Sequence, residues 1–422
     1  MKRRTFAAAV AGAVLAVGAA LAPAQAQTPS LTLWTWRQQE IPLWEAVGKK
    51  LNVKINVETT RPTEYDARLR IAMQDKGPDI IQGRAGAGWI DPYVQAGAFA
   101  PVDGLVNLGE RFPVVALNLM KASDGKTYGV PFAFQTTHFM YNQAVFDKLG
   151  LKEPQTWDEF WQVLDTIKQK GGGIAPLGAP GREAWALNIA EGILDASLLG
   201  SDFVRELQAG DRCFTDPKYV ENLRKLQRMS QYFQPGFAGN DTNDVLTSLA
   251  LGQVAIVPYG IFGMTPIRNV DPTVKIGLFL APADAGGKPA VFAYPDGGYY
   301  MNARTQQADT VKKVLAFTAT EEFGQMFVDI VGEIPAVRGN FKAQKERPEL
   351  QEALQFLNER PLEYLTWVRS PFRDGTPNLY DLQAAGLQQL YAGQTTPERL
   401  AKTIQDGLNT SYKPFMEKKK CG

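Results

Sequence analysis

Histidine and cysteine, on which many catalytic and metal sites depend, are scarce in this chain. Its 422 residues include one histidine, His138, and two cysteines, Cys213 and Cys421. A serine–histidine–aspartate triad could form only around His138, and a lone histidine is more often structural than functional. The sequence contains no HExxH motif, no CxxC pair and no P-loop. We therefore expect no metal site and no bound cofactor.

Aromatic and amide side chains, in contrast, follow several predicted strands. Trp36 comes directly after the strand predicted over 31–35, and Arg84 closely follows the one over 79–81. In open α/β sheets, ligands bind beyond the carboxyl ends of the strands. Polar side chains match the donors and acceptors of a polyhydroxyl ligand and aromatic faces cover a pyranose, so the pattern favours a neutral sugar. The other residues that carry this pattern are Arg37, Gln82, Gly83, Tyr259, Phe262, Asp296, Gly297 and Gly298.

The elements that must position these side chains alternate along the first part of the chain. Apolar alternation predicts strands over 31–35 and 53–57 and a short buried strand over 79–81. The residues between them, 38–50 and 63–76, read as helices. This order of strands and helices is typical of a parallel sheet with crossover helices.

Helices dominate the middle and the end of the chain. Thr156 and Glu159 have the spacing of a capping box, and glycines from Gly171 end the helix that they begin. Thr396 followed by Pro397 begins another helix near the end. No linker or repeat separates the chain into halves, and two lobes that share several chain crossovers would explain this.

The start of the chain has the pattern of a secretory signal peptide. Three basic residues precede an apolar stretch, and Ala24-Gln25-Ala26 gives a cleavage signal before Gln27. The alternative, an N-terminal membrane anchor, is disfavoured because the apolar stretch is short for a span. Without residues 1–26 the chain has 42 basic and 44 acidic residues, because three of the 45 basic ones are removed. A net charge of −2 argues against nucleic acid as a partner.

Export bears on the two cysteines and on membrane attachment. An oxidising compartment permits a disulfide between Cys213 and Cys421, while two free thiols remain the alternative. No cysteine lies near the cleavage point, so no lipid anchor is expected there.

Short motifs in order along the chain resemble the carbohydrate-binding solute receptors of ABC importers. Tyr128-Gly129-Val130-Pro131 leads to Thr136-Thr137 and Tyr141-Asn142, and the stretch 154–160 follows. The broader family is that of the maltose-binding protein, and the resemblance extends over nearly the whole mature chain. The other matching stretches are 77–80, 96–99, 146–148, 252–256, 332–336 and 395–398.

The resemblance implies a type II periplasmic-binding-protein fold, in which two α/β lobes are joined by several chain crossovers. One lobe would hold residues 27–138 and 298–343, and the other residues 139–297 and 344–422. In this family the lobes close on a solute about a hinge, as a Venus flytrap closes, and the closed form docks on the permease subunits of an ABC importer. We therefore expect a periplasmic monomer that binds a mono- or oligosaccharide and is not an enzyme.

The resemblance also places ligand-binding residues on this sequence. Gln82 and Arg84 stand where such receptors often contact sugar, and Trp185 resembles a loop tryptophan that covers the ligand. The family often has an acidic residue and a tryptophan where this chain has Tyr259 to Phe262, so Phe262 would replace the stacking ring. The expected ligand-binding residues are Trp36, Gln82, Arg84, Gln135, Thr136, Thr137, Trp185, Tyr259, Phe262, Asp296, Gly297 and Gly298.

Two other functions remain open at the level of sequence. The first is a receptor for another polar solute, such as a polyol, a glycerol phosphodiester or a polyamine, and Arg37 with Arg84 would suit an anionic group. The second is a secreted glycosidase, because a chain with 44 carboxylates can hold a catalytic pair that sequence alone does not reveal.

Overall fold

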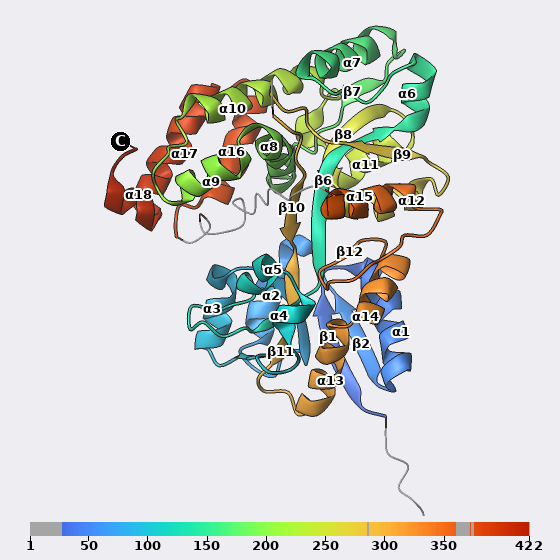
Figure 1. The fold of residues 1–422 in the computed structure, drawn as a ribbon, viewed down its shortest axis with the longest axis vertical. Helices are drawn as coiled ribbons and strands as arrows, with labels where there is room; N and C mark the ends of the chain where they lie inside the picture. Colours follow the sequence, from blue (N-terminus) through green and yellow to red (C-terminus); the bar gives the residue numbers. More distant parts are fainter. Residues whose placement is uncertain (1–27, 285–286, 360–371, 373–374, 422) are drawn as a thin grey trace, which may run out of the picture.

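The chain folds into two α/β lobes, each built around its own six-stranded sheet (Figure 1). The coordinates are a computed structural model, and they describe residues 28–284, 287–359, 372 and 375–421. The predicted signal peptide, residues 1–26, lies outside the described residues. The predicted fold class, α/β with two lobes, is confirmed.

The sheet of the first lobe has the order β2-β1-β3-β11-β4, with β5 paired to β11. Strands β1, β2 and β3 are parallel, and α1 and α2 connect them, as the alternation of predicted strands and helices indicated. Strand β11 comes from much later in the chain and pairs antiparallel with β3. The strands are β1 (Ser30–Thr35), β2 (Lys54–Thr59), β3 (Ile80–Arg84), β4 (Phe99–Ala100), β5 (Gly129–Pro131) and β11 (Gly297–Asn302). The helices are η1 (Gln38–Glu40), α1 (Ile41–Leu51), α2 (Pro62–Ala72), α3 (Ala87–Gln95), α4 (Leu108–Arg111), α5 (Val114–Asn118), α13 (Ala308–Thr318), α14 (Glu321–Met326) and η5 (Phe327–Val331).

The sheet of the second lobe is centred on β6, whose ten residues are all buried. Its order is β10-β6-β8-β7, and β9 and β12 also pair with β6. The strands are β6 (Ala133–Asn142), β7 (Ala175–Leu177), β8 (Val254–Gly260), β9 (Ile276–Phe279), β10 (Phe292–Pro295) and β12 (Ile334–Pro335). The helices are α6 (Gln143–Leu149), α7 (Trp157–Lys170), α8 (Ala184–Leu198), α9 (Gly200–Gln208), α10 (Pro217–Met229), η2 (Ser230–Tyr232), η3 (Phe237–Gly239), α11 (Thr242–Ala250), η4 (Ile261–Gly263), α12 (Met264–Val270), α15 (Pro348–Glu359), α16 (Leu379–Tyr391), α17 (Pro397–Ser411) and α18 (Lys413–Lys418).

The described chain passes between the two lobes three times. It crosses from β5 to β6, returns from β10 to β11, and crosses again after η5, through β12, to α15 (Figure 1). Strand β6 belongs to the second sheet from Ala133 onward, whereas the predicted first lobe extends to residue 138. The predicted lobe boundaries stay a prediction, because a strand that runs between lobes can be divided at more than one residue.

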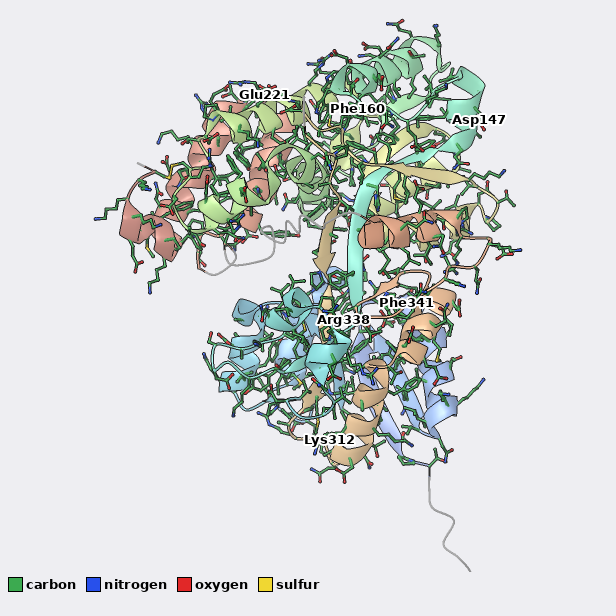
Figure 2. The ribbon with its side chains drawn as sticks, viewed as in Figure 1. Asp147, Phe160, Glu221, Lys312, Arg338 and Phe341 are labelled. Atoms are coloured by element: carbon green, nitrogen blue, oxygen red, sulfur yellow. A yellow bond between two sulfur atoms is a disulfide. The ribbon has the colours of Figure 1, made fainter. Side chains whose placement is uncertain are left out.

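The two predicted helix starts are confirmed. The hydroxyl of Thr156 accepts a hydrogen bond from the backbone N–H of Glu159 at 3.2 Å, and α7 then runs to Lys170 with Gly171 as its C-cap. Phe160, labelled in Figure 2, is fully buried on the apolar face of this helix. Thr396 caps α17 in the same way, with Pro397 as its first residue. Local capping chemistry therefore sets both boundaries.

The C-terminal residues are attached to the second lobe by covalent and ionic contacts. Cys213, which follows α9, forms a disulfide with Cys421. Close to this bond in the sequence, Lys418 and Lys420 each form an ion pair with Asp211 at 2.8 Å. Of the two alternatives for the cysteines, the structure contains the disulfide. Within the residues that the structure describes, no helix is both long and apolar enough to cross a membrane.

A cluster of polar side chains is buried among three helices of the second lobe. Glu191 and Asp195 lie one turn apart on α8 and are both fully buried. Tyr219 donates a hydrogen bond to Glu191 at 2.6 Å, Gln383 donates to the Tyr219 hydroxyl at 3.3 Å, and Asn222 donates to Asp195. Among the described residues, no lysine, arginine or histidine forms a hydrogen bond or ion pair with either carboxyl group. Burial therefore raises the pKa of Asp195, and repulsion from Glu191 raises it further.

We expect the substitution Asp195→Asn to raise the melting temperature more at pH 8 than at pH 4. The folded protein keeps a proton on this carboxyl that the unfolded chain loses above about pH 4, so the carboxyl destabilises the fold increasingly as the pH rises toward its folded pKa. Asparagine removes this effect and still accepts the hydrogen bond from Asn222. Thermal unfolding between pH 4 and pH 8 measures the difference, and Asp75→Asn, at an exposed position, is the control. An equal shift at both pH values would contradict the prediction.

Candidate functional site

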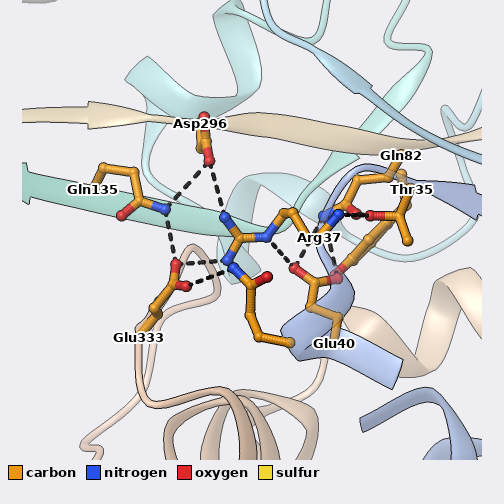
Figure 3. A network of polar contacts seen from close by, with 9 residues as sticks. Thr35, Arg37, Glu40, Gln82, Gln135, Asp296 and Glu333 are labelled. Carbon is orange, nitrogen blue, oxygen red and sulfur yellow. Dashed lines mark hydrogen bonds and ion pairs between the residues drawn. The ribbon is translucent and has the colours of Figure 1, made fainter. Parts of the chain in front are cut away.

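A buried arginine stands at the carboxyl end of β1, between the two lobes. The guanidinium of Arg37 contacts three carboxylates (Figure 3): Nε lies 2.5 Å from Glu40, Nη2 lies 2.6 Å from Glu333, and Nη1 lies 3.4 Å from Asp296. The backbone N–H of Arg37 donates to the hydroxyl of Thr35 at 2.8 Å, which fixes the chain where the strand ends. We call Arg37, these three acids and the amides that bond to them the Arg37 network.

Two of the expected ligand-binding amides belong to this network. Gln82 donates to both oxygens of Glu40, at 3.0 and 3.2 Å, and accepts a hydrogen bond from Thr35. Gln135 donates to Asp296 at 3.2 Å and to Glu333 at 2.9 Å. Both side chains are fully buried. Their amide N–H groups thus serve the protein's own carboxylates.

In this network, attraction between opposite charges opposes the cost of burying them. Burial alone would lower the pKa of Arg37, but attraction to Glu333, Glu40 and Asp296 outweighs burial and raises it. For Glu40 the balance is reversed, because burial raises its pKa more than Arg37 lowers it. Tyr299 on β11 donates a further hydrogen bond to Glu40 at 3.0 Å. Arg37 therefore remains a cation that is fully engaged by acids.

Two of the acids and one of the amides come from the three crossovers. Gln135 lies on β6 just after the first crossover, Asp296 lies between β10 and β11, and Glu333 lies directly before β12. Arg37 and Glu40 belong to the first lobe. The network thus ties the first lobe to each chain segment that leads to the second.

A partly exposed aromatic and cationic group lies next to the network in the first lobe. Because β1 and β3 are parallel neighbours, the side chains at their carboxyl ends meet: the guanidinium carbon of Arg84, the last residue of β3, lies 4.0 Å from the ring centre of Trp36. Tyr65 packs edge-on against Trp36 at 5.1 Å, and Asp66 lies 3.5 Å from Arg84 Nε. Trp36 and Arg84 are only partly buried. They therefore present a partly exposed aromatic ring and a cation at the carboxyl edge of this sheet.

A second aromatic group occupies the corresponding edge of the second lobe. Strands β7 and β8 are parallel, and Trp185 follows β7 while Phe262 follows β8. The ring of Tyr259 lies between them, 6.2 Å from Trp185 and 4.8 Å from Phe262. Trp185 and Phe262 are partly exposed, whereas Tyr259 is buried. Glu183, in the loop before Trp185, accepts hydrogen bonds from the backbone and hydroxyl of Thr242.

The remaining residues that were expected to bind ligand make their contacts with other atoms of the protein. Thr137 donates to the Phe292 carbonyl at 3.0 Å, and the Thr136 hydroxyl lies 2.9 Å from His138 Nε2. Gly297 and Gly298 pair with β3, and a Cβ at Gly297 would lie 2.0 Å from the Gly83 carbonyl oxygen. These two glycines thus allow β11 to pack closely against its neighbours.

His138 is fully buried in the second sheet. Burial lowers its pKa to about 3, so the imidazole is neutral at pH 7. Its environment fits a structural histidine, as the sequence indicated. Among the described residues, no group of three or more histidine, cysteine, aspartate or glutamate side chains is placed to hold a metal ion.

Sequence reasoning missed Tyr65, Asp66, Glu40 and Glu333 as neighbours of the site. The first three lie on or beside helices rather than beyond a strand, so the strand-end signal does not reach them. Glu183 could have been found, because it ends the turn-rich loop that leads into the helix of Trp185. The carboxyl edges of both sheets, with the Arg37 network between the lobes, form the candidate site.

Residues 37–325 match the family of bacterial extracellular solute-binding proteins. The chain belongs to this family. A multiple sugar-binding protein of Streptococcus mutans is 28% identical to the chain over 372 residues, which cover 86% of this chain and 84% of that protein. The similarity of this solute-binding protein to that relative extends over most of both chains.

Solved structures agree on the fold. The bacterial solute receptor AcbH, described as preferring β-D-galactopyranose, superimposes with a TM-score of 0.75 at 18% identity and covers 90% of this chain and 98% of its own. The solute-binding protein RafE in complex with raffinose gives a TM-score of 0.73 at 21% identity, covering 91% and 99%. At these identities the likeness concerns the fold of the solute-binding protein.

We expect Arg37→Met to destabilise the protein by about 3–5 kcal/mol, because it leaves three buried carboxylates without their counter-ion. The midpoint of urea unfolding measures the loss. Arg338→Met, at an exposed position close to the third crossover (Figure 2), is the matched control and should shift the midpoint little. Similar midpoints for both variants would show that the network contributes no such stability.

Proposed function

We propose that this protein captures a sugar between its two lobes and delivers it to the permease of an ABC importer. The observation that carries the proposal is the pair of partly exposed aromatic groups, Trp36 with Arg84 and Trp185 with Phe262, at the carboxyl ends of parallel strands in both lobes. Ligands of α/β sheets bind at such edges. A ligand that contacts both groups would hold the lobes together.

Sugar chemistry fits these groups best. An indole or phenyl face packs against the apolar C–H face of a pyranose, and Arg84, Asp66 and Glu183 can serve hydroxyl groups around it. The named relatives and solved neighbours include a multiple sugar-binding protein, a galactopyranose receptor and a raffinose complex, which supports the same ligand class. The mature protein would act as a monomer in the periplasm after removal of residues 1–26.

The contacts divide the expected site residues into two roles. We propose that Trp36, Arg84, Trp185 and Phe262 contact the sugar directly, with Tyr259 supporting the last two rings. Gln82, Gln135, Thr136, Thr137, Asp296, Gly297 and Gly298 would instead shape the hinge from which these side chains project. The burial of the polar members of this second set, and their bonds to protein atoms, support that division.

Closure would be a hinge motion of two nearly rigid lobes about the three crossovers. A ligand shifts the balance of open and closed states only if it binds them with different affinity, so it must contact both lobes. The Arg37 network lies where the crossovers meet and would act as the fixed point of this motion. The output is then a change of shape that the permease recognises.

The two other functions that the sequence left open gain no support. Arg37 is engaged by three carboxylates, so it does not combine with Arg84 to receive an anionic solute. The family is one of binding proteins rather than enzymes. We therefore propose binding without turnover.

A thermal-shift screen of mono- and oligosaccharides tests the proposal. A ligand that binds only the folded state raises the melting temperature according to its concentration relative to Kd. Small-angle scattering with the selected sugar should then show a smaller radius of gyration, and chromatography should recover the sugar unchanged. Saturated binding without compaction would refute closure, and a hydrolysed product would refute binding without turnover.

We expect Trp36→Ala and Trp185→Ala each to weaken binding of the selected sugar about tenfold or more, since each removes about 1.4 kcal/mol or more of contact. Isothermal titration calorimetry measures the change. The control is Trp157→Ala: Trp157 is also partly buried beside a cation, Lys225, but lies on α7, which lies apart from the crossovers (Figure 1). Unchanged affinity in both test variants would show that the sugar binds elsewhere.

A further inference from the structure

A small cavity lies beside the third crossover, outside the candidate sugar site. It has a volume of about 110 Å³ and lies between α12, the start of α15 and Gly332. The residues that line it are Met264, Thr265, Arg268, Asn269, Gly332, Arg347 and Glu349. Two arginines thus face one cavity with a single carboxylate among the lining residues.

Arg268 on α12 lines this cavity, and its guanidinium is only partly bonded to the protein. Its Nη2 donates to both oxygens of Glu349 at 2.9 Å and to the Glu346 carbonyl at 2.8 Å. Its Nε is buried and has no hydrogen-bond acceptor. A buried N–H without an acceptor costs about 1–3 kcal/mol, so the bonds to Glu349 and Glu346 leave part of the hydrogen-bonding capacity of Arg268 unmet.

Arg347, directly before α15, has no acceptor at all for its guanidinium among the described residues. The group lies against Gly332, where a Cβ would stand 1.7 Å from Nη1, so only glycine permits this approach. Burial lowers the pKa of Arg347, and repulsion from Arg268 lowers it further. The nearest carboxylates, Glu349 and Asp329, are bonded to Arg268 and Gln325. Among the described residues, neither carboxylate forms an ion pair with this half-buried cation.

We infer that this cavity binds a small tetrahedral oxyanion of the phosphate or sulfate class, held by Arg268 and Arg347. Guanidinium groups are the side chains best suited to such oxyanions, because their N–H groups form a fork that matches two oxygens. Thr265 and Asn269 add a hydroxyl and an amide on the cavity wall. The donors that line the cavity are Thr265, Arg268 and Asn269 on α12 and Arg347 directly before α15. They come from two chain segments and can bond more oxygens than the two that a planar carboxylate offers.

The position of the cavity gives the anion a structural consequence. Gly332 lines the cavity, and the next residue, Glu333, bonds to Arg37 in the network between the lobes. An anion held by Arg268 and Arg347 would fix the third crossover against α12 and α15. The site does not depend on the proposed sugar function, because none of its residues belongs to the two aromatic groups.

The test is a titration of the sugar-free mature protein with sodium phosphate and sodium sulfate at constant ionic strength. We expect a saturable rise in melting temperature, with a dissociation constant in the millimolar range or below by calorimetry. Arg347→Gln should weaken phosphate binding at least tenfold, because it removes a cation whose guanidinium makes no bond to the described residues. Arg347→Lys keeps the positive charge but loses the forked N–H geometry. Its affinity for phosphate should lie between those of the unaltered protein and Arg347→Gln.

Controls separate the site from general salt effects. Arg70→Gln, at an exposed position on α2, should bind phosphate as the unaltered protein does. A non-saturable response, or one that is equal in Arg347→Gln and Arg70→Gln, would overturn the proposal. An equally strong saturable response to sodium acetate would overturn the tetrahedral assignment. Circular dichroism of Arg347→Gln without phosphate confirms that the variant is folded.

Discussion

The contact on which the rest of this structure depends is the bond of one buried guanidinium to three carboxylates. A charge taken out of water is tolerated only if opposite charges and hydrogen bonds replace the solvent around it. Arg37 therefore has to meet Glu40, Asp296 and Glu333, and each of these lies on a different part of the chain. Once this requirement is met, the end of β1 and two of the crossovers are fixed in one place, and Gln135 adds the remaining crossover.

That fixed point determines which edges of the two sheets can act together. The parallel strands of both lobes, β1 with β3 and β7 with β8, are followed by the partly exposed aromatic residues. In open α/β sheets, the residues at the carboxyl ends of the strands are the ones that contact ligands. Buried hydrogen bonds and ion pairs hold the scaffold together, and the partly exposed aromatic rings remain available to contact a ligand.

Polar residues near the hinge and aromatic residues near the sheet edges therefore serve different purposes. A buried amide such as Gln82 is worth most where each of its groups has a protein partner, because an unmatched group in the interior is costly. A partly exposed ring such as Trp36 or Trp185 costs the fold little stability when no ligand covers it. The same reasoning distinguishes Arg37, which forms ion pairs with three carboxylates, from Arg347, which forms none with the described residues.

The sequence by itself determined the alternation of strands and helices, the caps at Thr156 and Thr396, and the residue types at the carboxyl ends of the strands. These depend on spacing and on local hydrogen bonds, which act over a few residues and can be read in order. Resemblance added the two-lobed fold and the family, because several short motifs stand in the right order.

Only the tertiary structure decided how those residues are used. Gln82 and Asp296 look like ligand-binding groups in the sequence, yet Glu40 and Arg37 engage them. Gln82 meets Glu40 from 42 residues away in the chain, and Asp296 meets Arg37 because a crossover 259 residues away returns to the end of β1. The disulfide between Cys213 and Cys421 likewise joins residues 208 positions apart. Burial and partners are set by contacts that are distant in the sequence, and no local pattern encodes which of many possible partners a polar side chain will meet.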